Sequence, residues 1–412
     1  MKASAYFAQS YAEARRKFID AAVAAGQEPR AHAHPLLGRD GELLAMDVAR
    51  FGPADAPAVL IISSACHGVE GYCGSGIQGA LLADAGLHAA AAQAGVALLY
   101  IHALNPYGFS WLRRTTHENV DLNRNFQDFS RPLPRNAAYD RIAHLIVPAE
   151  WPPTPEVKAG LAAFIAEHGQ KALQAAVSGG QYDHPQGLFY GGHNPTWSQQ
   201  TLRHVLQEHG RRCRRLAWLD LHTGLGPSGH GERIWAGPDD AVAVARARQW
   251  WGPEVTSIYD GSSTSAFLTG LMWTAIYDEC PQAEYTGIAM EYGTVPVLDV
   301  MNAIRYLKAN AATFHIDTSR VAVIGTSAGG ALALVDAIGQ LRASLAGGQS
   351  DGDGDEGGGE TTRAHGRSPV PARGRSARPW AADRARRCAR PPPASGALAG
   401  ATGRRCARRP RW

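Results

Sequence analysis

The sequence predicts an α/β protein with a mixed, mostly parallel sheet flanked by helices. Apolar runs of strand length alternate with helix-like segments over residues 46–293, as in chains whose strands are joined by helices. Polar and charged residues also gather where several of these apolar runs end. Both observations favour this class over an all-helical or all-strand protein.

Apolar runs rich in branched and aromatic residues predict six strands, at residues 46–52, 58–65, 96–104, 215–223, 274–279 and 287–293. Helix-like periodicity predicts helices at residues 76–87, 155–169, 197–209 and 240–251. The N-terminal segment "YAEARRKFIDAAVAAG" predicts an amphipathic helix and not a signal peptide, because charged residues interrupt any apolar core.

The last part of the chain differs in composition from the rest. Residues 349–412 are rich in Gly, Pro, Arg and Ala and lack a periodic apolar pattern, which predicts disorder. This tail carries 14 Arg and 6 acidic residues, and the remaining chain has 27 basic and 31 acidic residues. The pI of 8.7 therefore reflects the tail, and we expect no specific nucleic-acid partner.

Cysteine usage and hydropathy indicate a reducing compartment. The chain has 6 Cys and no CxxC pair, which argues against a disulfide framework or a zinc ribbon. No apolar run approaches the roughly 20 residues of a membrane span, so we expect no membrane partner and a cytoplasmic location. The oligomeric state stays open.

The stretch "CHGVEGYCGS" follows the apolar run "AVLIISSA" and places His67 three residues before Glu70. His222, in "DLHTG", follows another apolar run. Two imidazoles and one carboxylate leave the fourth position of a tetrahedral ion for water, as in a catalytic zinc site, so we expect one Zn²⁺ per chain. Glu291, in "MEYG", could then act as the base that takes a proton from this water.

Each of these features has an ordinary structural alternative. Chance would supply on the order of one HxxE among 16 histidines. A lone histidine such as His222 is often a hydrogen-bonded structural residue. Glu291 could be a helix cap or an ion-pair partner. Taken singly, none of these residues identifies a metal site.

The intervening loop "RRTTHENVDLNRNF" carries a longer pattern. In order, the chain contains "HGVE", "NPYG", Arg114, "DLNRNF", "DLHTG" and "MEYG". This set, over about residues 45–298, resembles the zinc carboxypeptidase superfamily, which includes the succinylglutamate desuccinylase and aspartoacylase enzymes. The wording "GLFYGGHNPTWS" and "DLHTGLGPSGHGE" resembles an uncharacterised bacterial branch of that superfamily.

The resemblance implies a role for each matching residue. His67, Glu70 and His222 would hold the zinc ion. Arg114 would stabilise the oxyanion, and Glu291 would act as general base and then as general acid.

The resemblance also implies residues that bind substrate. Asn123 and Arg124 would bind the terminal carboxylate, for which Arg offers a planar, charged fork. The alternative for Arg124 is a structural ion pair with Asp121 or Asp128. Tyr259 would be a mobile substrate-binding tyrosine, or alternatively a packed one.

Four further residues each have two possible roles. Arg113 competes with Arg114 for the oxyanion role. His230 and Glu232 could orient the ligands, or they could be polar loop residues. Cys66 could compete for the metal, although a buried free thiol is the simpler expectation.

A second motif lies near the end of the chain. The segment "VAVIGTSAGGALALV" places Ser327 in a strand–GxSxG–helix pattern that resembles the nucleophile elbow of hormone-sensitive-lipase-like α/β hydrolases. We therefore expect a fusion joined near residues 296–301. The expected parts are a zinc-carboxypeptidase-like domain at 1–298, an elbow fragment at 299–346 and a disordered tail at 347–412.

The function implied is a zinc-dependent hydrolase that cleaves an amide bond next to a free carboxylate. Its substrate would be a small peptide or an N-acyl amino acid, since a carboxypeptidase and a deacylase share the same site residues. Two alternatives stay open: a serine carboxylesterase that uses Ser327, and a non-catalytic zinc-bearing scaffold.

Overall fold

The structure of this chain is a computed structural model that describes residues 2–150 and 153–294. The expected elbow fragment at 299–346, with Ser327, and the expected tail at 347–412 lie outside the described residues.

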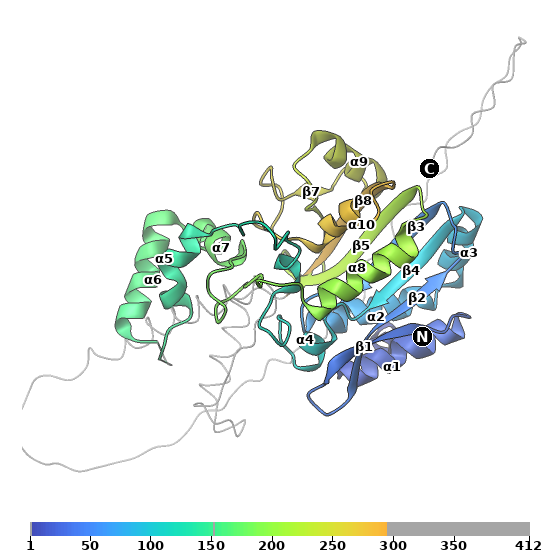
Figure 1. Ribbon diagram of the computed structural model, residues 1–412, viewed down its shortest axis with the longest axis horizontal. Coiled ribbons are helices and arrows are strands. Elements are labelled where there is room, and N and C mark those ends of the chain that lie inside the picture. Colours follow the sequence, from blue (N-terminus) through green and yellow to red (C-terminus); the bar gives the residue numbers. More distant parts are fainter. Residues whose placement is uncertain (1, 151–152, 295–412) are drawn as a thin grey trace, which may run out of the picture. The chain divides into compact units, whose positions relative to one another are not determined.

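A mixed eight-stranded sheet forms the centre of the described part (Figure 1). In sheet order its strands are β1 (Arg30–Leu37), β2 (Leu43–Phe51), β4 (Val96–His102), β3 (Ala58–Ser64), β5 (Arg215–Gly224), β8 (Glu284–Gly293), β6 (Gly231–Trp235) and β7 (Thr256–Ser257). The central strands β4, β3, β5 and β8 run parallel, while β1–β2, β2–β4 and β6–β8 are antiparallel pairs. The predicted fold class is confirmed.

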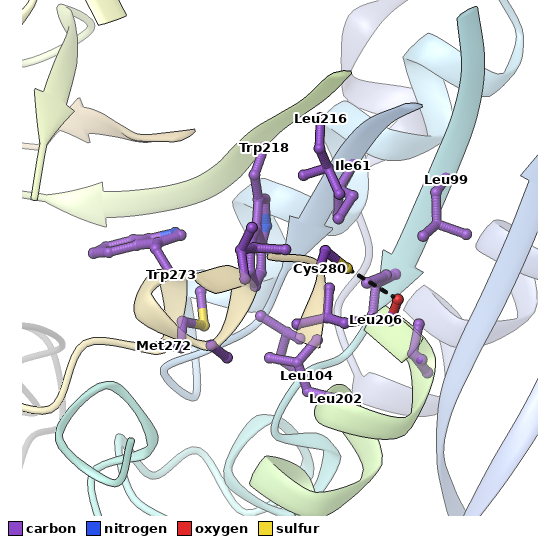
Figure 2. Close-up of a cluster of buried hydrophobic side chains, with 14 of the residues drawn as sticks. Ile61, Leu99, Leu104, Leu202, Leu206, Leu216, Trp218, Met272, Trp273 and Cys280 are labelled. Atoms are coloured by element: carbon purple, nitrogen blue, oxygen red, sulfur yellow. Dashed lines mark hydrogen bonds between the residues drawn. The ribbon is translucent and has the colours of Figure 1, made fainter. Parts of the chain in front are cut away.

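Helices cover both faces of this sheet. One face carries α1 (Tyr11–Ala24), α2 (Glu70–Leu82), α3 (Ala85–Gln93) and α9 (Ala241–Trp251). The other face carries α8 (Trp197–Gly210), the 3₁₀ turn η3 (Met272–Thr274) and α10 (Ala275–Glu279). Figure 2 shows the core on this second side, where Trp218 of β5 packs near Met272 and Trp273.

The remaining helices lie in the connections. They are η1 (Ala3–Tyr6), α4 (Pro106–Ser110), η2 (Leu122–Arg124), α5 (Ala137–Ile146), α6 (Pro155–His168) and α7 (Gln170–Ser178). The helices α5–α7 pack around an apolar core of their own. Among the described residues, no helix combines the length and apolar character that crossing a bilayer requires.

The central strands each contain a continuous apolar run because both faces of the sheet are buried there. In β3, Ile61 faces the core under α8, and Ile62 faces the core under α1 and α2. In β5, Trp218 and Leu221 face these same two cores. Alternate side chains of a strand project to opposite faces, so a parallel sheet covered on both sides needs continuous apolar runs.

Most predicted elements are confirmed, one is wrong and one is misplaced. Five predicted strands correspond to β2, β3, β4, β5 and β8, and three predicted helices to α6, α8 and α9. Residues 274–279 are helical and not a strand, since they form the end of η3 and α10. A short apolar run does not distinguish a strand from a buried helix, and this one packs on α8 through the core that contains Ile276.

The predicted helix at 76–87 is misplaced. Helix α2 begins at Glu70, and α3 begins after Asp84, whose side chain accepts a hydrogen bond from the N–H of Leu87. The glycines of "EGYCGSG" allow α2 to pack closely on the sheet. A Cβ at Gly74, for example, would lie 2.7 Å from the Cβ of Ser64 in β3.

Candidate metal centre

His67 lies in the turn between β3 and α2, and Glu70 begins α2. Gly68, between them, has a φ of 36°, and a Cβ there would lie 2.1 Å from the carbonyl oxygen of Arg113. Only glycine therefore fits without moving the backbone. The turn makes Glu70 the first residue of α2, where the free N–H groups of a helix start favour a negative charge.

His222 joins these residues from the end of β5. Because β5 pairs in parallel with β3, the side chains that follow both strands meet at one edge of the sheet. Nδ1 of His67 lies 3.3 Å from Oε1 of Glu70, and Nδ1 of His222 lies 3.1 Å from Oε2. One ligand atom from each residue falls within 4.8 Å of the others, and all three side chains are buried.

The donor set fits a metal ion. His67 Nδ1 and Glu70 Oε1 are buried and have no hydrogen-bond partner in the described part of the chain. A buried polar atom without a partner is costly, and a cation between these atoms would satisfy both. Imidazole nitrogens with one carboxylate are a ligand set that zinc and related metals accept. The three residues could therefore hold a metal ion.

Two buried carboxylates orient the histidine rings. His67 Nε2 lies 3.2 Å from Asp121 Oδ1 and 3.1 Å from Nη2 of Arg114, and His222 Nε2 bonds to the carboxylate of Asp220. The second oxygen of Asp220 accepts from Ser63 Oγ at 2.5 Å. Each bond at Nε2 leaves Nδ1 as the metal-facing nitrogen.

This orienting role of Asp121 and Asp220 was not predicted from the sequence. The two-residue spacing of Asp220 and His222 along one strand was a usable signal, because it puts both side chains on one face.

Opposite charges dominate the electrostatics of the three residues. Burial opposes the charge on Glu70, but the charges of His67 and His222 hold the pKa of its carboxyl well below the usual range. Burial also opposes a charge on the His222 ring, yet Asp220 and Glu70 raise its pKa well above the ordinary value. A metal cation can supply the positive charge that these carboxylates favour, since it binds the deprotonated rings.

Glu291 lies beside the three residues on β8. This strand pairs in parallel with β5, and Glu291 is the register partner of His222. Its Oε1 accepts from the N–H of Leu225 at 2.9 Å. Burial, and next the charge of Glu70, raise the pKa of Glu291 to about 7. A carboxyl group with this pKa can accept and release protons near neutral pH.

Arg114 reaches the site from the loop that follows α4. Its Nε donates to Asp121 at 2.8 Å, and its Nη1 lies 3.6 Å from Oε1 of Glu70. Arg113 instead donates to Thr115 and does not line the pocket beside the histidines. The geometry therefore favours Arg114 over Arg113 as the arginine of this site.

A pocket of about 50 Å³ connects these groups. Its polar side is lined by His67, Arg114, Asn123, Arg124, His222 and Glu291. Much of the remaining wall is apolar and comes from Leu225, Ile234, Ala236, Leu268, Trp273 and Ala289. Seven of the eight expected site residues lie in or directly behind this pocket, with Glu70 behind the two histidines.

Arg124 is a buried cation held by backbone carbonyl groups. Its Nε and Nη2 donate to the carbonyl oxygen of Ser178 at 3.2 and 2.6 Å, and its Nη1 donates to that of Asn123 at 2.7 Å. Within residues 2–150 and 153–294, no carboxylate forms an ion pair with Arg124, so the pair with Asp121 or Asp128 is absent. Burial lowers the pKa of this guanidinium, which makes an anionic ligand favourable.

Asn123 lines the same pocket, and within the described residues its side-chain amide nitrogen forms no hydrogen bond. Its Oδ1 accepts from the N–H of Met272 at 3.0 Å. The amide nitrogen is therefore the end that could donate to a carboxylate.

Tyr259 is the expected site residue that the structure does not bring to the pocket. Its hydroxyl donates to the carbonyl oxygen of Gly237 at 2.7 Å, and its ring borders a separate surface pocket with Arg248.

Glu232, His230 and Cys66, for which the sequence left two interpretations, lie in different environments. Glu232 is buried and accepts from the hydroxyl of Thr256 and the N–H of Thr264, so it fixes a loop and contacts no metal ligand. His230 is exposed. Burial raises the pKa of the Cys66 thiol well above its ordinary value, in keeping with a neutral, buried thiol.

A family model described as "Protein of unknown function (DUF2817)" matches residues 7–327. The match continues past residues 296–301, where we expected a junction, so it does not support a separate esterase-like fragment. No curated protein matches the chain.

Similar solved structures include several carboxypeptidases. Carboxypeptidase A from Helicoverpa armigera has a TM-score of 0.38 and 13% identity, over 83% of this chain and 75% of that chain. Bovine thrombin-activatable fibrinolysis inhibitor has a TM-score of 0.38 and 13% identity, over 69% and 85%. A metallo-carboxypeptidase from Burkholderia cenocepacia has a TM-score of 0.32 and 13% identity, over 80% and 69%.

Proposed function

The chain belongs to the DUF2817 family, whose description assigns no function, and we propose that it is a zinc-dependent hydrolase. The bond cleaved is an amide next to a free carboxylate, in a small peptide or an N-acyl amino acid. The observation that carries this proposal is Arg124, a buried guanidinium without a carboxylate partner in the described residues, in the same pocket as the metal-ligand set.

In this proposal His67, Glu70 and His222 hold one zinc ion. Zinc, when bound, lowers the pKa of a water ligand to about 7 and polarises a carbonyl group. Asp121 and Asp220 fix the two imidazole rings with Nδ1 toward the ion.

Glu291 is the proposed proton carrier. Its carboxylate accepts a proton from the water that attacks the amide carbon. It then donates this proton to the nitrogen as the carbon–nitrogen bond breaks, so the products are an amine and a carboxylic acid that keeps the second proton of the water until it ionises. A pKa of about 7 suits both directions of transfer at neutral pH.

Each of the two arginines binds a different negatively charged group in this proposal. Arg114, whose Nη1 is buried without a hydrogen-bond partner in the described part, donates to the oxygen that becomes negative during attack. Arg124 and the amide nitrogen of Asn123 bind the substrate carboxylate. A role for Tyr259 requires its hydroxyl to leave Gly237, and it stays a prediction.

We assign this activity to the domain at 1–298. The alternative of a serine carboxylesterase depends on Ser327, which lies outside the described residues. The alternative of a zinc-bearing scaffold shares the metal site but lacks turnover.

A substrate panel tests the proposal. The zinc-loaded full chain is assayed with N-acetyl amino acids and dipeptides, each as the free acid and as the C-terminal amide. We expect hydrolysis of some free acids and a rate at least about tenfold lower for the matching amides, because the Arg124 contact is lost. Full zinc occupancy without hydrolysis of any member would favour the scaffold.

A further inference from the structure

Phe189 presents its ring to both arginines of the pocket. The guanidinium carbon of Arg114 lies 4.7 Å from the ring centroid, and that of Arg124 lies 5.6 Å from it. Both distances fall within the roughly 6 Å range of cation–π attraction, which is stronger where the groups are desolvated. Phe189 is only 3% exposed, so this ring and both cations share a dry environment.

The backbone at Phe189 is strained. Its φ is 51°, in the left-handed region that bulky residues rarely adopt. Such a conformation costs about 1–3 kcal/mol and persists only where surrounding contacts impose it.

Hydrogen bonds impose this conformation from several directions. All five carbonyl groups of residues 187–191 accept hydrogen bonds. Gln181 donates to two of them, from Nε2 to Leu188 and from its backbone N–H to Phe189. The other three bonds are Asn119 Nδ2 to Gly187, the N–H of Asp121 to Tyr190, and Asn125 Nδ2 to Gly191. Three of these donor residues come from the 119–125 segment, which also contains Arg124. The strained turn and the substrate-binding loop are therefore held by one network.

Helices α5–α7 also hold Phe189 and Arg124 in place. Phe189 belongs to their apolar core, together with Tyr139, Leu173 and Val177. The last residue of α7, Ser178, accepts two hydrogen bonds from Arg124, where helix carbonyls carry a partial negative charge. The three helices thus hold Arg124 both through the Ser178 carbonyl and through the Phe189 ring.

From this geometry we propose that Phe189 is a positioning residue, whose ring holds the guanidinium groups of Arg114 and Arg124 where the oxyanion and the substrate carboxylate bind. The identity of these two bound groups rests on the proposed function, whereas the contacts between the ring and the arginines are observed in the structure.

Binding of two matched probes tests this role in the zinc-loaded full chain. N-acetyl-L-alanine carries the carboxylate, and N-acetyl-L-alaninamide lacks it. Phe189→Leu keeps an apolar side chain at the same strained φ but removes the aromatic face. We expect about tenfold weaker binding of the acid by calorimetry, little change for the amide, and near-normal binding of the acid in Phe189→Tyr.

Controls separate positioning from general stability. Phe164→Leu alters a ring that packs on the same helical core and contacts no arginine in the described residues, so acid binding should stay within about twofold. In an Arg124→Met background, Phe189→Leu should weaken acid binding by much less than it does in the wild type. Equal loss for acid and amide, or an undiminished loss in that background, would overturn the proposal. Phe189→Met replaces Phe189→Leu if the latter does not fold.

Failure of the proposed function gives a different result. In that case the wild type binds acid and amide equally well. The ring is then tested by thermal unfolding of Phe189→Leu, Arg124→Met and the double variant. If the ring holds the arginine, the double variant loses less in Tm than the two single losses together, whereas additive losses reject the role of Phe189.

Discussion

His222 and Glu291 are register partners on the adjacent parallel strands β5 and β8. Paired residues of neighbouring strands project from the same face, so the proposed metal ligand and the proposed base lie side by side. The sheet fixes their relation, and Glu291 needs no flexible loop to reach the site.

Glu291→Gln should keep the metal and lose turnover. The amide preserves the shape of the side chain but cannot accept the proton, so we expect kcat to fall by about 10²–10⁴ at unchanged zinc content. Elemental analysis and steady-state kinetics on the same preparation check this.

Glu232→Gln is the matched control, because Glu232 is the register partner of Glu291 on β6. Its carboxylate is held by Thr256 and Thr264, and turnover should stay within a few-fold. Near-normal kcat in a fully metallated Glu291→Gln protein would show that another group is the base.

Replacing a proposed ligand should remove the metal. Wild-type protein should retain close to one zinc per chain after dialysis, whereas His67→Ala and His222→Ala should lose it, with affinity lowered by more than about a hundredfold. His204→Ala, at an exposed histidine of α8, serves as the control and should bind normally. A wild type without zinc after supplementation would disprove the metal site.

The candidate metal ligands could be predicted because each follows a recognisable apolar strand. The carboxyl ends of neighbouring parallel strands share one edge of a sheet, so HxxE after one strand and a histidine after another imply proximity. Arg114 and Arg124 were found through their place in an ordered motif. Tyr259 came from the same resemblance, but its hydroxyl bonds to Gly237 outside the pocket.

The groups that hold the two arginines in place could not be predicted in the same way. The Phe189 ring contacts the arginines from a backbone with a positive φ, and sequence periodicity does not encode such a backbone at a non-glycine residue. Ser178 contributes through a backbone carbonyl, which every residue type carries. The strand predicted at 274–279 is wrong because tertiary packing on α8, and not local propensity, decides the conformation of this segment.

Arg124→Ala should act mainly on substrates with a free carboxylate. Loss of a charge-assisted bidentate contact corresponds to about 3 kcal/mol, or about a hundredfold in kcat/KM for the free acid. The C-terminal amide should be hydrolysed at nearly the wild-type rate. Arg113→Ala is the control, since its side chain does not line the pocket. Equal losses on acid and amide would assign Arg124 a structural role only.

His102 should make the protein sensitive to acid. The residue is fully buried, stacks on Phe18 at 4.6 Å and contacts the hydroxyl of Ser75 at 3.0 Å. Burial lowers its pKa to about 4, while the nearby Asp47 and Arg15 act in opposite directions as smaller influences. The folded protein therefore keeps this ring neutral at pH values where an unfolded chain protonates it.

The sign of the effect follows from proton binding. Between about pH 6.5 and pH 4 the unfolded chain binds a proton at His102 that the folded chain does not, so the stability present above pH 6.5 is lost as the pH falls. The full loss is about 3 kcal/mol. His102→Phe should have a flatter pH dependence, measured as the free energy of urea unfolding at several pH values. Contributions from groups other than residue 102 cancel in the difference between the two proteins. Parallel curves for wild type and variant would show that His102 does not titrate in this way.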